Sequence, residues 1–335
     1  MIERNKHWEI IANYESAELV RRQFTARHGR SLNAAKAQEI CAAFTQARGY
    51  MQSASEAERV VRPLLTYYGV LSLSRGLALF LSTQLREAGL AQAHGLGAEA
   101  WGDELSRNGG SVAALKIKIN PRGTFRQLLE ATEHLSYLRS NSSAPNHIQR
   151  CDMPPASAEL TFLDALSRLP EIRATFRRWR DERHAVAFWP QGVRPDGRHE
   201  FRVDSPYTLD DVRAVLGDIP EVTDDSGRSL TLLVPSDMDL PPLSDSTGSF
   251  GIGEIVALAR WPTGLELSKI ALAFVASYGL GMLVRYFPAH WISMLQNRAH
   301  DAAVPTLLAA LDHVETEFPR FVVEFLEPPD SLPAA

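Results

Sequence analysis

The sequence predicts a mainly α-helical fold, a helical bundle around two central apolar helices with a small β insertion. Two segments, residues 63–89 and 261–296, are the basis of this prediction, and the second is the longest nearly uncharged run in the chain. The interior of the second segment is apolar on all sides, which is typical of a buried helix rather than an amphipathic one. Alternation of apolar and polar residues, the pattern of a strand, is confined to a few short runs.

Two amphipathic segments precede the first apolar helix. Residues 7–23 and 34–54 have helical periodicity, and in the second segment Ile40, Phe44 and Ala47 fall on one side. We expect both helices to cover the core. The apolar helix then begins at Pro63 and ends before Gly89, because proline is favoured in the first turn of a helix and glycine just past its last turn.

The second apolar segment is expected to form a helix from Leu265 to Phe287, and apolar residues recur at every fourth position between Ile270 and Met282. A membrane span is the competing interpretation. Its uncharged core has only 15 residues, bracketed by Lys269 and Arg285, whereas a span needs about 20. We therefore expect a buried helix and no membrane.

A local pattern is shared by the two apolar helices. Tyr68-Gly69 is followed by Arg75, and Tyr278-Gly279 is followed by Arg285, each arginine seven residues after its tyrosine. Seven residues make two turns, so tyrosine and arginine share a face, and the adjacent glycine permits close approach of another backbone. The pattern predicts that the two helices pack against each other. The alternative is coincidence between two core helices rich in small residues.

The remaining elements are shorter. Helices are expected at 125–138, 157–169, 170–185, 305–317 and 320–326, and strands at 114–120, 200–203 and 230–234, with a flexible connection at 244–254. The polar, proline-rich stretch 141–157 is the expected boundary loop. The predicted organisation is an N-terminal helical part of the core (1–140), this loop (141–157), a helix with a small β insertion (158–250) and a C-terminal helical part of the core (251–335).

Composition limits the possible functions. With 335 residues and 45% hydrophobic residues, the chain has an ordinary globular composition, and its formal net charge of −5 argues against a surface that coats nucleic acid generally. Any anion site must therefore be local. The first residues lack the organisation of a signal sequence, and Cys41 and Cys151 have no metal-binding spacing, so we expect a cytoplasmic protein with no metal or cofactor.

Three motifs carry a resemblance to a known family. These are PLLTYYGVLSLSRGLALF from Pro63, His94-Gly95-Leu96, and SYGLGMLVRYFPAHW from Ser277. Together they resemble the YaaC-like family of bacterial proteins, and the segment from Met282 to Trp291 is the most specific part. The resemblance implies an architecture more than an activity. His94 either marks a functional turn or lies incidentally in a glycine-assisted turn.

Arg285 and His290 form the first candidate site. Four residues separate them, which is similar to the R-x4-6-H spacing of HEPN ribonucleases. Histidine can exchange the proton of a ribose 2′-hydroxyl while arginine stabilises charge on the phosphate, without a metal, and the resemblance implies a homodimer. Pro288 is expected to break the helix between them. The alternative is that Arg285 is a buried ion-pair partner for Glu254, Glu266 or Asp312, with His290 beginning the next helix.

The second candidate is a basic stripe at residues 171–184. Arg173, Arg177, Arg180 and His184 recur at helical spacing, interleaved with Phe176 and Trp179. A phosphate backbone or an anionic protein can lie along such a stripe, with the aromatic rings stacking on bases or anchoring the helix. The alternative is a solvated helix face balanced by neighbouring carboxylates.

These candidates lead to two hypotheses. The first is an intracellular interaction or regulatory protein, in a bacterial regulatory or defence setting, that recognises an anionic protein partner, RNA or DNA through arginine clusters. The alternative is a metal-independent HEPN-like ribonuclease that uses Arg285 and His290. Motifs of serine hydrolases, zinc proteases and kinases are missing from the sequence.

Overall fold

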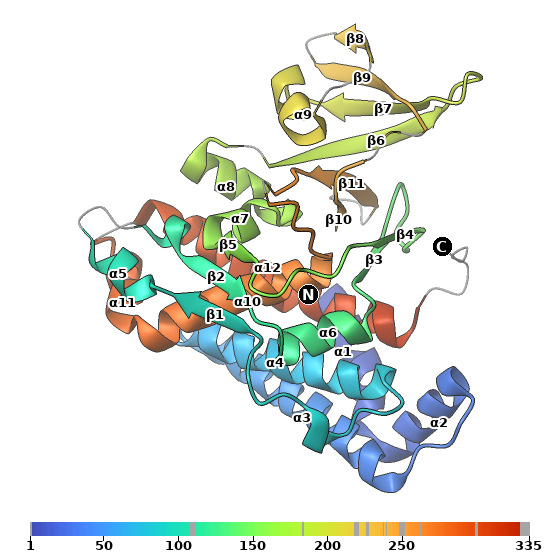
Figure 1. The fold of residues 1–335 in the computed structure, drawn as a ribbon, viewed down its shortest axis with the longest axis vertical. Coiled ribbons are helices and arrows are strands. Elements are labelled where there is room, and N and C mark those ends of the chain that lie inside the picture. The colour runs from blue at the N-terminus through green and yellow to red at the C-terminus, as the bar shows by residue number, and fades with distance from the viewer. Residues whose placement is uncertain are drawn as a thin grey trace. The chain divides into compact units, whose positions relative to one another are not determined.

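The structure is a computed structural model, and its chain divides into two compact units (Figure 1). It describes residues 2–107, 111–182, 184–217, 221–225, 228–236, 238, 240–247, 252–261, 263–298 and 301–328. Unit 1 comprises residues 1–134, 153–165 and 269–328, and unit 2 comprises 135–152, 166–268 and 329–335. Unit 1 is thus assembled from segments at both ends of the chain. Each unit is described by itself below.

Unit 1 is mainly helical. Its helices are α1 (Ile2–Ala12), α2 (Ala17–His28), α3 (Ala34–Glu56), α4 (Arg62–Leu81), α5 (Trp101–Ser106), α6 (Thr124–Ala131), α10 (Lys269–Tyr286), α11 (Pro288–Leu295) and α12 (Val304–Leu326). Helix α3 begins after Asn33, whose side chain accepts a hydrogen bond from the Lys36 backbone N–H and caps the helix. Helix α4 packs against α3, α10 and α12, so it lies at the centre of the unit.

The two apolar helices are buried and pack against each other, as predicted. All of α10 from Lys269 to Val284 is buried, and the ring of Tyr67 on α4 lies 5.7 Å from that of Tyr278. The glycine at this interface is not one of the two predicted. A Cβ atom added to Gly281 would lie 2.7 Å from Tyr67 Cβ, whereas Gly69 faces Met51 of α3 and Gly279 faces Phe162.

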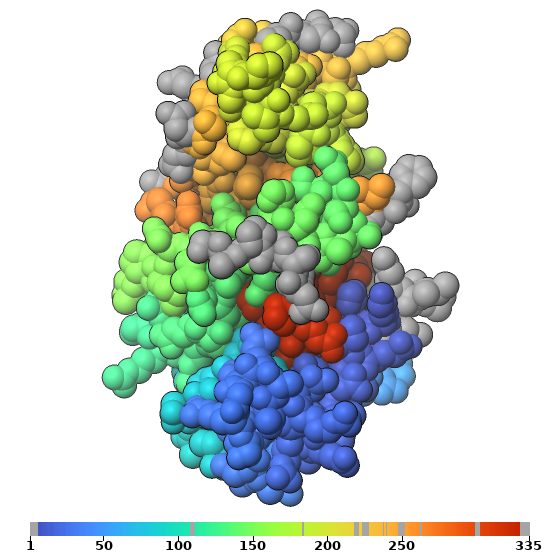
Figure 2. Space-filling model, turned by 90° about the vertical axis from the view of Figure 1, so that its right-hand side faces the viewer, coloured from blue at the N-terminus to red at the C-terminus, as the bar shows by residue number. Residues whose placement is uncertain are grey.

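The C-terminal helix α12 joins the N-terminal helices to the core. Arg27 Nη1 on α2 donates to the Phe325 carbonyl at 2.8 Å, and the end of α12 is visible in red beside the blue N-terminal segment in Figure 2. Deeper in the unit, Glu324 accepts from Arg320 at 2.7 Å and lies 3.0 Å from the Lys269 ammonium. These buried charges compensate each other, which an apolar interior requires.

A small sheet completes unit 1. Strands β1 (Leu96–Glu99), β2 (Lys116–Ile119) and β5 (Glu159–Thr161) pair antiparallel in the order β1-β2-β5. Strand β2 confirms the strand predicted at 114–120. Helix α7 (Phe162–Ser167) follows β5 and crosses the boundary between the units at residue 165.

Unit 2 is built on a six-stranded antiparallel sheet with the order β10-β11-β6-β7-β9-β8. Its strands are β6 (Ala185–Val193), β7 (His199–Asp204), β8 (Glu221–Asp225), β9 (Ser229–Val234), β10 (Leu243–Thr247) and β11 (Gly253–Leu258). The unit also contains the hairpin β3 (Leu135–Leu138) and β4 (His147–Arg150), and helices α8 (Arg173–Arg180) and α9 (Leu209–Leu216). Strands β7 and β9 confirm the two predicted at 200–203 and 230–234.

The predicted fold class, mainly α with a small β insertion, is wrong in the extent of its β structure. The described chain contains three sheets, and the largest is the framework of unit 2. Strand β6 was missed because Ala185–Phe188 is buried on both faces and lacks polar alternation. Strands β10 and β11 occupy the ends of the expected flexible connection, whose residues 248–251 lie outside the described residues. Residues 135–138 form β3 rather than the end of a helix.

Within the described ranges, two helices, α4 and α10, are long and apolar enough to cross a membrane by length and composition. Of the most apolar window of each, 72% of α4 and 89% of α10 is buried inside the protein. Core helices of soluble proteins pass the same test, so the finding is weak evidence for a membrane span.

Candidate functional site

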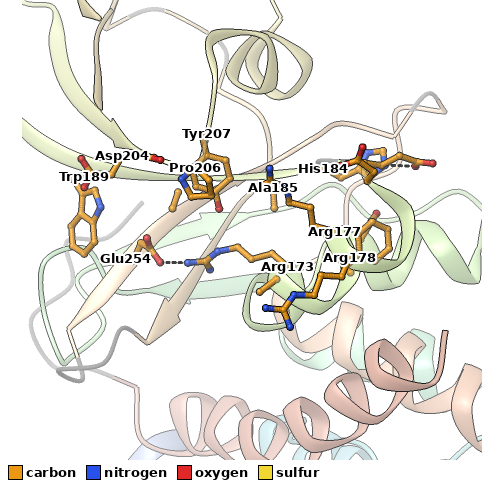
Figure 3. Close-up of a pocket in the computed structure, with 17 residues that line it drawn as sticks. Arg173, Arg177, Arg178, His184, Ala185, Trp189, Asp204, Pro206, Tyr207 and Glu254 are labelled. Atoms are coloured by element: carbon orange, nitrogen blue, oxygen red, sulfur yellow. Dashed lines mark hydrogen bonds and ion pairs between the residues drawn. The ribbon is translucent and has the colours of Figure 1, made fainter. Parts of the chain in front are cut away.

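A pocket of about 710 Å³ in unit 2 contains most of the predicted basic stripe (Figure 3). It is bounded by α8, by one face of β6, by the turn from Asp204 to Tyr207, and by Glu254 of β11. Its volume lies in the range typical of small-molecule sites, roughly 300–1,000 Å³. The stripe therefore borders a concave space rather than an open helix face.

The pocket is hollow because of the side chains on one face of β6. Ala185, Ala187 and Trp189 line it, at alternate positions of the strand. The residues between them, Val186 and Phe188, point to the opposite face and belong to the hydrophobic core of unit 2. The small side chains of Ala185 and Ala187 form a flat surface, which we call the floor of the pocket, and the indole ring of Trp189 lies at one end of it.

Arg173 is committed to interactions within the protein. Its guanidinium donates to Glu254 at 2.7 Å, to the Ser246 hydroxyl at 3.1 Å and to the Pro170 carbonyl at 3.0 Å. Figure 3 shows it reaching across to Glu254. Since its charge is compensated, Arg173 serves to link α8 to the sheet, and it is the least available of the predicted anion ligands.

Arg177 is differently placed. It is half-buried and lines the pocket, and none of the described carboxylates forms an ion pair with it. Its neighbour Arg178, which was not in the predicted stripe, is exposed and likewise has no carboxylate partner within the described chain. The two side chains leave α8 in different directions (Figure 3), as successive residues of a helix do. Arg177 is therefore the main cation offered to the pocket.

The last two residues of the stripe share one carboxylate. Arg180 and His184 lie 3.4 and 3.2 Å from Glu182, and the Arg180 guanidinium also lies 5.9 Å from the centre of the Trp179 ring. His184 lines the pocket, whereas Arg180 is not among the lining residues. The structure thus brings Arg173, Arg177 and His184 to one site, and Arg177 is the one of the three with no carboxylate partner among the described residues.

The other predicted pair, Arg285 and His290, lies in unit 1. Arg285 is exposed at the end of α10 and donates to the Tyr68 hydroxyl at 3.1 Å, so it is not the buried ion-pair partner considered as an alternative. Pro288 starts α11, which confirms the helix break between the pair. His290 Nε2 lies 3.0 Å from the Leu105 carbonyl, an acceptor, so this nitrogen carries the proton.

The three carboxylates proposed for Arg285 have other partners. Glu254 pairs with Arg173, Glu266 with Arg260 and Asp312 with Arg62.

Sequence reasoning missed the residues that make the pocket a cavity, which are Ala185, Ala187, Trp189 and Tyr207. The alternation of small side chains with Val186 and Phe188 was a usable signal, but it requires knowing that β6 is a strand with two buried faces. Tyr207 follows Pro206 in a turn and had no periodicity to reveal it. No cluster of three or more metal-ligating side chains was found among the described residues.

Comparison with known families gives one result. A family model described as YaaC-like Protein matches residues 12–231 and 236–326. The chain belongs to the YaaC-like family. The match includes the pocket of this YaaC-like protein as well as Arg285 and His290. No curated protein and no solved structure matches the chain.

Proposed function

We propose that this YaaC-like protein is a cytoplasmic binding protein that recognises a nucleotide unit, free or within single-stranded RNA or DNA, in the pocket of unit 2. The proposal depends on Arg177, which is half-buried and has no carboxylate partner in the described chain. Arg177 lines the pocket together with Ala185, Ala187 and Trp189 of β6. A planar base can lie on such a floor, and aromatic rings stack on bases without sequence preference.

The charges of the pocket favour a ligand with few charges over a long polyanion. Of the lining carboxylates, Glu254 pairs with Arg173, Glu182 with His184, and Asp204 with Arg202. Asp181 also lines the pocket, with no ion pair in the described chain, and it offsets one of the two free arginines. The remaining positive charge suits one phosphate group, whereas a tightly bound polyanion needs many phosphate contacts.

The test is calorimetric titration with adenosine monophosphate, adenosine and a short single-stranded RNA. We expect Arg177→Gln to weaken the binding of the monophosphate by about tenfold and to leave adenosine unaffected, because a hydrogen bond to a charged group contributes about 1.5–3 kcal/mol. Arg194→Gln is the matched control, since Arg194 pairs with Glu200 and does not line the pocket. Equal affinity of wild type and Arg177→Gln for the monophosphate and the RNA would contradict the proposal.

The alternative function, metal-independent RNA cleavage by Arg285 and His290, is favoured by one observation, the exposed guanidinium of Arg285 with no carboxylate partner in the described part of the chain. The hydrogen bond of His290 to Leu105 opposes it, because Nε2 is occupied. The assay is RNA cleavage in a chelator by wild type and His290→Ala. Cleavage that is lost in His290→Ala and retained in Arg177→Gln would favour this alternative.

A further inference from the structure

A second group of charged and polar side chains lies in unit 1, and the pocket of unit 2 does not use it. Arg75 on α4 and Arg285 on α10 flank a group of aromatic and imidazole rings formed by Tyr67, Tyr278 and His94. We call these five residues the central cluster. They come from the three sequence motifs on which the family resemblance rests.

The rings of the cluster contact one another closely. Tyr67 Oη and His94 Nδ1 are 2.6 Å apart, and the ring of His94 lies 6.0 Å from that of Tyr278. None of the described residues hydrogen-bonds His94 Nε2, so the other ring nitrogen has no partner within the described chain. The contact with Tyr67 therefore fixes the orientation of an imidazole that keeps one nitrogen available.

Glycines hold the two sides of the cluster at a fixed separation. Gly281 lets α10 approach Tyr67, as described above. Gly123, at φ +140°, lies against the His94-Gly95 turn, and a Cβ atom added there would lie 2.1 Å from Gly95 Cα. The backbone N–H of Phe125 also donates to the His94 carbonyl at 3.0 Å. His94 thus sits in a turn that close backbone contacts hold in place.

The cluster has positive charges with no negative charge paired to them. Arg285 donates to the Tyr68 hydroxyl and Arg75 to the Ala91 carbonyl at 3.3 Å, and neither has an ion-pair partner among the described carboxylates. Arg75 Nε is buried, with no acceptor in the described chain. Burial lowers the pKa of His94, and the charges of Arg285 and Arg75 lower it further. Glu39 and Glu87 line a pocket with Arg75, but the charges that act on His94 are the two guanidiniums. A positive field of this kind at His94 favours an anion.

We propose that the central cluster is an oxyanion site that binds a phosphoryl group through Arg75, Arg285 and His94. Two guanidiniums carried by different helices, together with an imidazole, can bind three oxygens of a tetrahedral anion. A carboxylate has two oxygens in one plane and satisfies fewer of these donors. The buried hydroxyls of Tyr67 and Tyr278 remain protonated, because burial raises the pKa of both, that of Tyr278 to about 12.

Binding of the anion is expected to take up a proton. The groups that face His94 are Arg75, Arg285, Tyr67 and Tyr278, and the described residues place no carboxylate among them. A bound dianion supplies the missing negative charge, which raises the pKa of His94 and allows its imidazole to donate from both nitrogens. The affinity for a dianion of constant charge, such as sulfate, therefore increases as the pH falls toward the pKa of His94.

The experiment is calorimetric titration of inorganic phosphate, sulfate and acetate at low ionic strength, in the Arg177→Gln background so that the pocket of unit 2 does not contribute. We expect phosphate and sulfate to bind and acetate to bind at least about tenfold more weakly. Arg285→Gln and Arg75→Gln are each expected to weaken phosphate binding by about tenfold or more. Arg194→Gln is the control with an equal loss of charge.

Two variants separate binding from folding. Arg285 is exposed, so Arg285→Gln keeps the fold, which circular dichroism verifies. His94→Gln is expected to abolish the uptake of a proton on binding of sulfate, whose own charge is constant near neutral pH, as measured in buffers of different ionisation enthalpy. The proposal would be overturned if folded Arg285→Gln bound phosphate as tightly as the Arg177→Gln parent. It would also be overturned if the Arg177→Gln parent did not bind millimolar phosphate. Proton uptake unchanged by His94→Gln would remove His94 from the site.

Discussion

The pocket of unit 2 and the central cluster of unit 1 both present arginines, but they obtain uncompensated charge in different ways. In the pocket, Arg173 is neutralised by Glu254, and a nearby residue on the same helix, Arg177, is left without a carboxylate partner in the described chain. In the central cluster, two helices distant in sequence each contribute one arginine, and none of the described carboxylates pairs with either. The first arrangement depends on a network of ion pairs, and the second depends on helix packing.

The two sites are expected to differ in how substitutions affect them. We expect the pocket above Ala185 and Ala187 to tolerate substitutions at its rim, because its shape comes from a strand whose other face packs in the core. The central cluster has no such separation, since Tyr67 belongs both to the helix interface and to the hydrogen bond with His94. Substitutions in the interface are therefore expected to affect stability and anion binding together.

The largest expected effect tests this coupling. Gly281→Ala places a Cβ atom 2.7 Å from Tyr67 Cβ, and we expect it to destabilise the protein by about 1–3 kcal/mol in urea unfolding. Gly49→Ala in α3 is the control, because a Cβ atom there meets nothing within 4 Å. Removal of a helical glycine should stabilise by about 0.5–1 kcal/mol. Equal effects of the two substitutions would show that the helices are not in close contact.

In unit 2, Glu254→Gln removes the ion-pair partner of Arg173. The side chain of Glu254 is only 12% exposed and that of Arg173 is 31% exposed, so we expect a loss of about 1–2 kcal/mol in the free energy of unfolding. Asp204→Asn is the matched control, since Asp204 and Arg202 are 44% and 46% exposed and such pairs contribute about 0–1 kcal/mol. A larger loss from Asp204→Asn would contradict the assigned role of Arg173.

Filling the pocket separates the two sites from each other. Ala187→Leu adds volume to the floor without changing any charge, and we expect at least about tenfold weaker binding of adenosine monophosphate. Phosphate binding in unit 1 should be unchanged, as measured by calorimetry. Ala174→Leu, on the exposed side of α8, is the control for added bulk at the rim. Retained nucleotide affinity in Ala187→Leu would show that the ligand does not occupy the floor.

A change of pH is expected to distinguish the central cluster. The pKa of His94 is lower in the folded protein than the ordinary value of about 6.5 in the unfolded chain. The unfolded chain therefore binds a proton at His94 more readily than the folded protein does. The stability contributed by the neutral imidazole is fully present above about pH 6.5 and is lost as the pH falls from there through the lower pKa of the folded state. His94→Gln should reduce this slope, as measured by denaturation at several pH values, and a slope unchanged by the substitution would contradict this expectation.

The smallest effect is expected at Arg180. Its partner Glu182 is 42% exposed at a distance of 3.4 Å, and Arg180 does not line the pocket. Arg180→Gln should change the free energy of unfolding by less than about 0.5 kcal/mol and leave nucleotide affinity unaltered. A tenfold loss of affinity would instead support the complete basic stripe as the binding surface.

The sequence by itself determined the helical framework of unit 1. Dense apolar runs identified α4 and α10, and the shared tyrosine–arginine spacing predicted their packing, because periodicity reports which positions of a helix avoid water. The same periodicity failed for β6, β10 and β11, because none of them alternates apolar and polar residues: β6 begins with an apolar run, β11 is apolar after Glu254, and β10 is polar after Leu243. The extent of β structure was underestimated for that reason.

Only the tertiary structure decided which residues form the sites. Arg173 and Arg177 are equivalent in the sequence pattern, yet one is neutralised by Glu254, 81 residues away, and the other is not. Likewise, His94 belongs to the central cluster because the close contact of its His94-Gly95 turn with Gly123 places it beside Tyr67. Spacing along one helix fixes the face on which a side chain lies, but the charge that compensates it comes from whichever distant segment the fold places there.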